Sequence, residues 1–392
     1  MTPRTVILGY ARTPFGKLSG GLASLTAAQL GGHAIAAAIE RSGIKPEDVQ
    51  HVVMGHVLQA GAGQITARQA AFAAGLAETV TAETVNKVCA SAMRAISLAD
   101  LQIRAGEHDV VVAGGMESMT NAPHVAHVRA GVRMGDASLV DSMLHDGLTN
   151  PFRNVRMLTD GAEVAKELGI SRDVQDAWAA RSHQRVVASE EFLAGEIAPV
   201  TIHGRKGDTV VDRDESVRPD TTVETLARLK ELDVEGGGTT AGNAPSVNDG
   251  GTALVLASEE WALANGHTPL AYVGRHAYVA GRTQDLALMP GNATKLLLER
   301  EGLTVADIAR FEFNEAFASV TLHAVDDLGI DPERVNVHGG AIALGHPIGA
   351  SGARIVGTLM RELQQSGGGL GIAGICSGGG QGDALLIEVP AS

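Results

Sequence analysis

The chain repeats part of its own pattern, and this repeat limits the folds that it can adopt. Three segments of the first half recur in the second half at one offset of about 260 residues, which chance would rarely supply. The matched pairs are residues 40–49 and 299–308, residues 88–96 and 348–356, and residues 111–116 and 371–376. In both halves, apolar strand-like runs alternate with helix-like runs, which is typical of a sheet covered by helices on both faces. The sequence therefore predicts an α/β fold built from two similar halves.

The stretch between the repeats, residues 119–247, differs in composition from both halves. It is richer in charged residues, turn residues and histidine, and we interpret it as a domain inserted into the first half. The pattern from Ser171 to Glu190 predicts an amphipathic helix, with Ser171 as its N-cap and Asp173 as a first-turn acid. The basic residues of this stretch, which would form either a surface for an anionic ligand or a solvated mixed face, are Arg172, Arg181, Arg185, Arg205, Lys206, Arg213 and Arg218.

Length and composition fit this division. A chain of 392 residues with 44% hydrophobic residues is long enough for more than one domain and for a large core. The strand-like run at residues 249–256 marks where the first half resumes. We predict an N-terminal half over residues 1–268, which contains the insertion over residues 119–247, and a C-terminal half over residues 269–392.

The charge of the chain limits its partners. The formal net charge is −14, whereas a protein that binds nucleic acid needs a basic face for the phosphates. No apolar run is long enough to cross a membrane. Residues 5–9 indicate a first strand rather than a signal peptide, and residues 389–392 carry no targeting tripeptide. We expect a soluble cytoplasmic enzyme that binds neither nucleic acid nor a membrane.

Cys89 is one of only two cysteines, and it stands where a strand-like approach gives way to a run of helix formers. At a helix N-terminus, unpaired N–H groups and the helix dipole favour the thiolate, which is the nucleophilic form of the side chain. The sequence therefore predicts an activated Cys89. The alternative for this segment taken alone is a small core cysteine.

The second cysteine, Cys376, follows an apolar run and precedes a glycine-rich stretch that includes Gly378. Glycines let the backbone approach a ligand closely and aim several N–H groups at one point. A disulfide between the two cysteines would be unusual in a chain without a secretory signal. Two reduced cysteines, each at the end of a strand-like run, indicate two separate roles.

Two further motifs follow strand-like runs, at the sheet edge where open α/β folds place their sites. Asn314 begins the first motif, Asn-Glu-Ala-Phe, and His346 lies between Gly345 and Pro347 in a glycine-rich turn before a helix. These neighbours fix the backbone, which makes sense if the imidazole must point in one direction. The chain shows no CxxC or HExxH spacing, no phosphate loop and no GxSxG elbow, so we expect neither a metal site nor a serine hydrolase.

Together these motifs resemble the signature set of the thiolases, and within that family they are most similar to the acetyl-CoA acetyltransferases (acetoacetyl-CoA thiolases). The matching segments run in order along essentially the whole chain: residues 86–91, 114–119, 240–244, 248–250, 314–317, 345–349 and 376–380. The resemblance implies a five-layer αβαβα core made of two similar halves, with an inserted loop domain that binds coenzyme A. It also implies a homodimer or a homotetramer.

The resemblance implies a role for each motif residue. Cys89 would take an acyl group from acyl-CoA as a thioester, in ping-pong chemistry, and His346 would accept its proton. Cys376 would remove or return the proton on the α-carbon of the second acetyl-CoA. Asn314 would hold a water that, with His346, binds the thioester oxygen as the enolate forms. The backbone N–H groups of Cys89 and Gly378 would form the other oxyanion hole.

The resemblance also implies a substrate site. Met157, Ala244, Ala316 and Phe317 would contact the coenzyme A thioester, and Arg218 would lie near the adenine. The substrates would be acetyl-CoA, 3-ketoacyl-CoA and free CoA, with no bound cofactor.

Two departures from the family pattern leave the acyl chain open. Leu158 and Pro245 stand where the family usually has a glycine and a serine, and the serine meets the pantetheine. The alternative activity is therefore a 3-ketoacyl-CoA thiolase for longer or branched acyl chains. A weak acyl-CoA-binding partner protein would not need paired cysteines. Decarboxylating ketosynthases generally pair their cysteine with two histidines, whereas Asn314 occupies the second position here.

Overall fold

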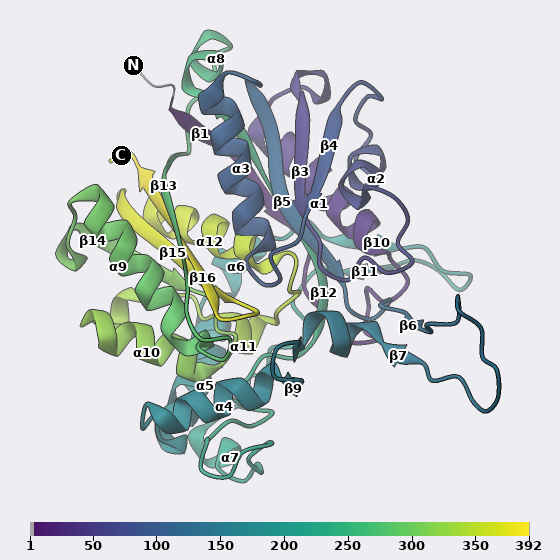
Figure 1. Cartoon of the computed structure of the whole chain (residues 1–392). Helices are drawn as coiled ribbons and strands as arrows, with labels where there is room; N and C mark the ends of the chain where they lie inside the picture. The colour runs from purple at the N-terminus through teal and green to yellow at the C-terminus, as the bar shows by residue number, and fades with distance from the viewer. Residues whose placement is uncertain (1–3, 392) are drawn as a thin grey trace.

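The computed structural model describes residues 4–391, and its long strands form one ten-stranded mixed sheet. The strands follow the order β14-β15-β16-β13-β1-β12-β5-β3-β4, and β2 pairs with β12 (Figure 1). The first part of the chain supplies β1 (Thr5–Arg12), β2 (Gly16–Lys17), β3 (His51–Gly55), β4 (Thr81–Val85) and β5 (Val110–Ser118). The segment after the insertion supplies β12 (Asn248–Ser258). The strands from the last part are β13 (Ala271–Ala280), β14 (Ile308–Phe313), β15 (Gly369–Ser377) and β16 (Gln381–Val389).

The sheet consists of two half-sheets that meet at a short junction. Strands β1 and β13 pair antiparallel through only three residues each, from Thr5 opposite Val273 to Ile7 opposite Ala271. Within the halves the ladders are longer: β5 and β12 pair antiparallel through nine residues each. The parallel pairs also recur, because β3 lies parallel to β5 in one half and β14 lies parallel to β15 in the other.

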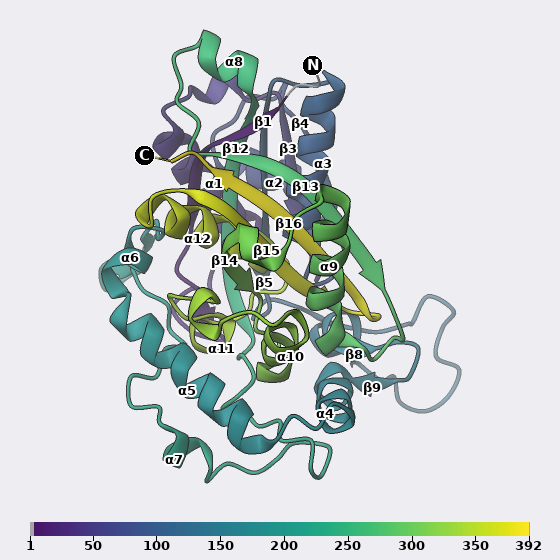
Figure 2. The same cartoon turned by 90° about the vertical axis from the view of Figure 1, so that its left-hand side faces the viewer.

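The helices lie in three layers around the half-sheets (Figure 2). Helices α3 (Ser91–Ala105) and α12 (Ser351–Gln365) contact each other and the inner faces of both half-sheets, and their apolar side chains form the central core. Helices α1 (Ala27–Ser42) and α2 (Thr66–Ala73) cover the outer face of the first half-sheet. Helices α9 (Met289–Glu301) and α10 (Ala318–Leu328) cover the outer face of the second. The predicted five-layer α/β architecture of two similar halves is confirmed. The shorter helices α8 (Glu259–Ala264) and α11 (Ala341–Leu344) stand in connections.

Glycines at equivalent positions of the repeat terminate two helices. Gly43 follows α1 with φ +72° and Gly302 follows α9 with φ +67°, and both donate a backbone N–H back to the last turn. Only glycine adopts this left-handed conformation without a steric penalty. Within residues 4–391, no helix is both long enough and apolar enough to cross a membrane.

The chain between β5 and β12 forms small elements outside the main sheet. Its hairpins are β6 (His124–Val125) with β7 (Val140–Asp141), β8 (Thr149–Asn150) with β9 (Val155–Arg156), and β10 (Val200–Ile202) with β11 (Thr209–Val211). Its helices are α4 (Met157–Glu167), α5 (Arg172–Ala188), α6 (Glu190–Ala194) and α7 (Val223–Leu226). Because β5 and β12 are neighbours in the sheet, this insertion leaves and returns at one place.

The helix predicted from Ser171 to Glu190 is present as α5, but it is not amphipathic in the usual sense. Its buried face carries Gln175, Asp176, Ser182 and His183 beside its apolar residues. These side chains are buried because they hydrogen-bond to other segments, for example Asp176 Oδ1 with Asn243 Nδ2 at 2.9 Å. Asp173 is in the first turn as predicted, whereas Ser171 occupies the N-cap position without a capping side-chain bond.

Three arginines of α5 do not belong to a free cationic surface. Arg172 donates to the carbonyl of Leu226, whereas Arg181 and Arg185 both donate to the carbonyl of Val335. Arg181 and Arg185 therefore bind the insertion to the C-terminal half, whereas Arg172 binds α5 to another segment of the insertion.

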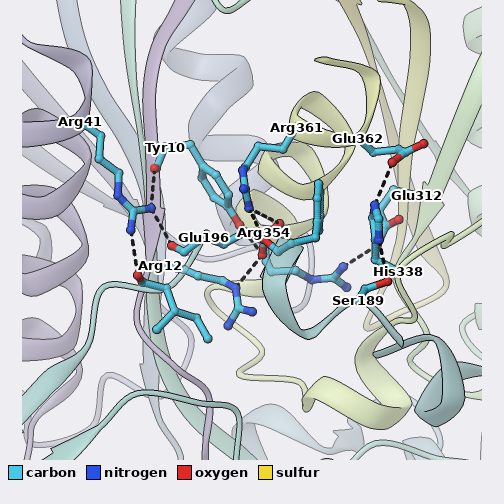
Figure 3. A network of polar contacts seen from close by, with 12 residues as sticks. Tyr10, Arg12, Arg41, Ser189, Glu196, Glu312, His338, Arg354, Arg361 and Glu362 are labelled. Carbon is cyan, nitrogen blue, oxygen red and sulfur yellow. Dashed lines mark hydrogen bonds and ion pairs between the residues drawn. The ribbon is translucent and has the colours of Figure 1, made fainter. Parts of the chain in front are cut away.

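Buried ion pairs also tie the insertion to the first half (Figure 3). Arg12 of β1 pairs with Glu196 at 2.8 Å and with Asp214 at 2.7 Å, and all three side chains are inaccessible or nearly so. Arg354 of α12 pairs with Glu312 of β14 deeper in the second half. Removing one partner of such a buried pair leaves an uncompensated charge, which typically costs about 3–5 kcal/mol.

Candidate active site

Four residues singled out by the sequence converge near the ends of β14 and β15 and the starts of α3 and α12. Asn314 follows β14, Cys376 is the last residue but one of β15, Cys89 stands two residues before α3, and His346 lies in the turn before α12. All four side chains are buried, and both cysteines are free thiols. The segments of the two cysteines are in contact, because Ser377 Oγ, next to Cys376, donates to the carbonyl of Lys87, two residues before Cys89. The backbone N–H groups of Cys89 and Gly378 both point at the sulfur of Cys89.

A strained elbow presents Cys89. Val88 has φ +46°, in the left-handed region, where a β-branched residue is a genuine outlier. The hydroxyl of Ser91 holds the elbow, because it accepts from the N–H of Lys87 at 2.8 Å and donates to the carbonyl of Val88 at 2.6 Å. Such strain costs on the order of 1–3 kcal/mol and persists only where the surroundings enforce it.

The turn before α12 fixes both the position and the tautomer of His346. Gly345 has φ +104°, and a Cβ there would come within 2.5 Å of the Asn248 side chain, so glycine is required. Ser351 Oγ donates to the carbonyl of Pro347 at 3.0 Å. His346 Nδ1 must therefore carry the proton and donate to Ser351 Oγ at 2.6 Å, which leaves Nε2 as an acceptor.

The acceptor nitrogen of His346 faces Asn314. Asn314 Nδ2 lies 3.5 Å from His346 Nε2, and Asn314 Oδ1 is buried without a hydrogen-bond partner among residues 4–391. Burial, with a smaller contribution from the charge of Arg354, lowers the pKa of His346 to about 3. The imidazole is consequently neutral at physiological pH and able to accept a proton at Nε2.

Burial disfavours the thiolate at both cysteines, contrary to the expectation of a thiolate at Cys89. Burial raises the pKa of Cys89 to about 12, and the N–H groups of Cys89 and Gly378 lower it by less than burial raises it. Burial and the neighbouring Cys89 raise the pKa of Cys376 well above that of a free thiol. The helix terminus is present, but desolvation of the charged sulfur outweighs it.

A cavity of about 490 Å³ lies beside this set of residues, lined by sequence neighbours of the two cysteines and by none of the four residues themselves. Val88, Gly378 and Gly379 line the side next to Cys89, and Met157 lines another wall. The polar residues around the rest of the cavity are His145, Asp146, Thr149, Asn150 and Gln381. The site therefore combines a reactive interior with a partly polar approach.

Four of the five predicted substrate-binding residues lie together beside Cys376. Ala316 and Phe317 pack with Cys376 in one apolar cluster, and Met157 and Ala244 pack against it, as does Leu158. Arg218 is apart from this cluster: it is exposed, and its backbone N–H donates to His183 Nδ1 at 3.1 Å.

Sequence reasoning did not single out some residues that shape the site. Ser351 orients His346, and its position five residues on, just inside the next helix, is the only signal that could have found it. The strain at Val88 leaves no trace in the residue types. Within residues 4–391, no group of three or more histidine, cysteine or carboxylate side chains is arranged to hold a metal ion.

Comparisons with known proteins match the whole chain. A family model described as "Thiolase, N-terminal domain" matches residues 5–260, and one described as "Thiolase, C-terminal domain" matches residues 267–389. A probable acetyl-CoA acetyltransferase of Mycobacterium leprae (strain TN) is 46% identical, with 99% of this chain and 100% of the relative covered. The acetyl-CoA acetyltransferase of Escherichia coli (strain K12) is also 46% identical, with 98% of each chain covered. The crystal structure of the Bacillus anthracis acetyl-CoA acetyltransferase superposes with a TM-score of 0.96 at 37% identity and covers 99% of each chain.

Proposed function

The chain belongs to the thiolase family, and we propose that it is an acetyl-CoA C-acetyltransferase, which condenses two acetyl-CoA to acetoacetyl-CoA and CoA and also catalyses the reverse thiolysis. The observation that carries this proposal is the buried arrangement of two free thiols beside a neutral imidazole whose acceptor nitrogen faces an asparagine amide. The full-length relatives named acetyl-CoA acetyltransferase support the choice of substrate.

In the first half-reaction, the sulfur of Cys89 attacks the thioester carbonyl while its proton moves to His346 Nε2. Burial raises the pKa of the Cys89 thiol and lowers that of His346, so a proton transfer between the two resting groups is unfavourable. Transfer is therefore coupled to bond formation, since the negative charge then passes to the carbonyl oxygen. The N–H groups of Cys89 and Gly378 bind that oxygen. Collapse of the tetrahedral species breaks the C–S bond to CoA, which leaves as the thiol with the proton from His346.

In the second half-reaction, the Cys376 thiol gives its proton to His346 Nε2, and the resulting thiolate removes a proton from the α-carbon of the next acetyl-CoA. A thiolate with a raised pKa is a strong base, which suits a weakly acidic C–H bond. Protonated His346 Nε2 and a water that Asn314 holds donate to the thioester oxygen as the enolate forms; the buried, unpaired Oδ1 of Asn314 supports its role toward the water. The enolate carbon then attacks the acetyl-Cys89 thioester, and acetoacetyl-CoA forms as the C–S bond to Cys89 breaks. The Cys89 sulfur takes the proton back from His346 Nε2, which restores the resting state.

The apolar cluster beside Cys376 supports a binding role for Met157, Ala244, Ala316 and Phe317 toward the acyl-pantetheine end of the substrate. Arg218 is proposed to meet the adenine end, and its exposure fits a charged group. Leu158 packs against the same cluster, and this departure from the family pattern keeps the second candidate, a 3-ketoacyl-CoA thiolase for longer or branched chains.

The remaining assignments are also proposals. The halves are taken as residues 1–268 and 269–392, with the insertion at residues 119–247 as the part that binds coenzyme A. We propose a homodimer or homotetramer in the cytoplasm that serves fatty acid metabolism and carries no bound cofactor.

The test of the activity is thiolysis by the purified protein of acetoacetyl-CoA and of longer and branched 3-ketoacyl-CoAs with free CoA. Highest kcat/KM on acetoacetyl-CoA supports the acetyltransferase, and a preference for longer or branched chains supports the second candidate. Inactivity on the whole series, with the protein folded, would overturn both.

A further inference from the structure

Glu315 is a buried carboxylate that the proposed chemistry does not use. It is inaccessible to solvent and accepts hydrogen bonds from four donors. Trp178 Nε1 at 2.9 Å and Asn336 Nδ2 at 3.1 Å donate to Oε1. Ser182 Oγ at 2.8 Å and the backbone N–H of Ile342 at 3.1 Å donate to Oε2. Both oxygens are thus fully engaged.

The four donors come from three parts of the chain that surround the candidate active site. Trp178 and Ser182 belong to α5 of the insertion, and Asn336 brackets the end of β14 through two bonds with the backbone of Phe313. Ile342 lies in α11, four residues before His346.

Glu315 itself directly follows Asn314, so one carboxylate joins the segments that carry Asn314 and His346. The backbone between them is packed just as closely. Gly340 donates to Ser182 Oγ at 3.0 Å, and a Cβ on Gly340 would collide with the Glu315 carboxylate.

We propose that Glu315 is a positioning residue that sets the geometry between Asn314 and His346, and that α5 of the insertion acts on the reaction through it. The inference rests on the proposed function for its kinetic readout. The insertion then has a role besides binding substrate: its indole and hydroxyl donors hold the carboxylate that aligns the proton acceptor with the asparagine amide.

Glu315→Gln tests this with an almost identical shape. Whichever way the new amide is turned, its NH2 group faces donors: either the Trp178 indole and Asn336, or the Ile342 N–H and Ser182. The segments must therefore shift. We expect kcat per acetylatable Cys89 to fall about 10- to 100-fold, since a displacement of about 1 Å can cost that much, while KM for acetyl-CoA changes less than about threefold.

Glu196→Gln is the matched control, because Glu196 is also an inaccessible carboxylate but lies in the ion-pair network with Arg12 (Figure 3). We expect it to lower the melting temperature and leave kcat per acetylatable site unchanged. Trp178→Phe removes one donor and keeps the carboxylate, so it should reduce kcat per site several-fold. It carries the test if Glu315→Gln does not fold.

Alkylation of Cys89 by iodoacetamide, followed by mass spectrometry, separates this inference from the proposed function. If the wild type cleaves no 3-ketoacyl-CoA, the proposed activity fails, yet slower alkylation in Glu315→Gln or Trp178→Phe than in Glu196→Gln would still support the positioning role. Wild-type kcat per site and wild-type alkylation rate in a folded Glu315→Gln would overturn it, as would equal losses in Glu196→Gln.

Discussion

The two halves share one succession of strands and helices, but they place different residues at equivalent points. Where β15 carries Cys376, β5 carries Met116, and where Cys89 precedes α3, Gly349 precedes α12. At the second locus, a Cβ on Gly115 would collide with the carbonyl of Gly349, and a Cβ on Gly349 would collide with that of Met116. Backbone contacts therefore fill the locus of Met116 and Gly349, which we call the closed locus. The locus of Cys376 and Cys89, the open locus, keeps two thiols beside a cavity. Duplication supplied two similar frames, and the difference between them is made by a few side chains.

The largest effect is expected at the open locus. Cys89→Ser should reduce thiolysis by at least about 10⁴-fold, because a serine hydroxyl is a much weaker nucleophile in the same place. Mass spectrometry after incubation with acetyl-CoA should show no acetylated protein. A persistent acetyl adduct would place the nucleophile elsewhere.

Cys376→Ala and Met116→Ala form a matched pair at equivalent positions of the two half-sheets. The first should leave acetylation of Cys89 intact and slow condensation by about 10²–10⁴-fold, the range lost with a general base. The second removes a fully buried side chain and should cost about 2–5 kcal/mol of stability with little change in kcat per site. Equal loss of both half-reactions in Cys376→Ala would contradict the division of roles between the cysteines.

The pH dependence of stability should also separate the two equivalent turns before α3 and α12. Burial lowers the pKa of His346 from 6.5 to about 3, whereas Asn86, five residues before α3 as His346 is before α12, does not titrate. Between about pH 6.5 and 3 the unfolded chain binds this proton and the folded chain does not. His346 therefore makes the free energy of unfolding fall by a few kcal/mol as the pH drops through this window. In His346→Gln, the free energy of unfolding measured with urea should depend less steeply on pH than in the wild type. The same pH dependence in both proteins would exclude this contribution.

The smallest effect is expected at the closed locus. Gly115→Ala adds one methyl group against the carbonyl of Gly349 and should destabilise the fold by about 1–3 kcal/mol. The urea midpoint measures this loss, and kcat per acetylatable Cys89 should stay at the wild-type value. A fall in kcat without a loss of stability would show that the closed locus still acts on the open one.

The sequence predicted the features that depend on local pattern. The repeat predicted two similar halves, which is confirmed, and the motifs pointed to Cys89 and His346, whose roles stay predictions. Both inferences depend on periodicity and residue identity, which act over a few neighbouring residues.

Features that depend on burial in the folded state were missed. The helix start at Ser91 suggested a thiolate at Cys89, but desolvation by the surrounding chain decides its protonation. The polar residues of α5 suggested a solvent-exposed face. Ser182 and Trp178 are instead buried, and both donate hydrogen bonds to Glu315, more than 130 residues away in the sequence. The residues next to Cys89 and to α5 in the sequence give no sign of these distant contacts.

The short junction between β1 and β13 gives the molecule a natural dividing line. The connection after β12 passes through α8, where Leu263 is 60% exposed, so a break of the chain there would fall on the surface. It would leave Cys89 on one fragment and Asn314, His346 and Cys376 on the other. Neither piece could turn over substrate alone, and recovered turnover on mixing would report reassembly across α3 and α12. The chain is thus suited to serve as a split reporter whose signal is its own chemistry.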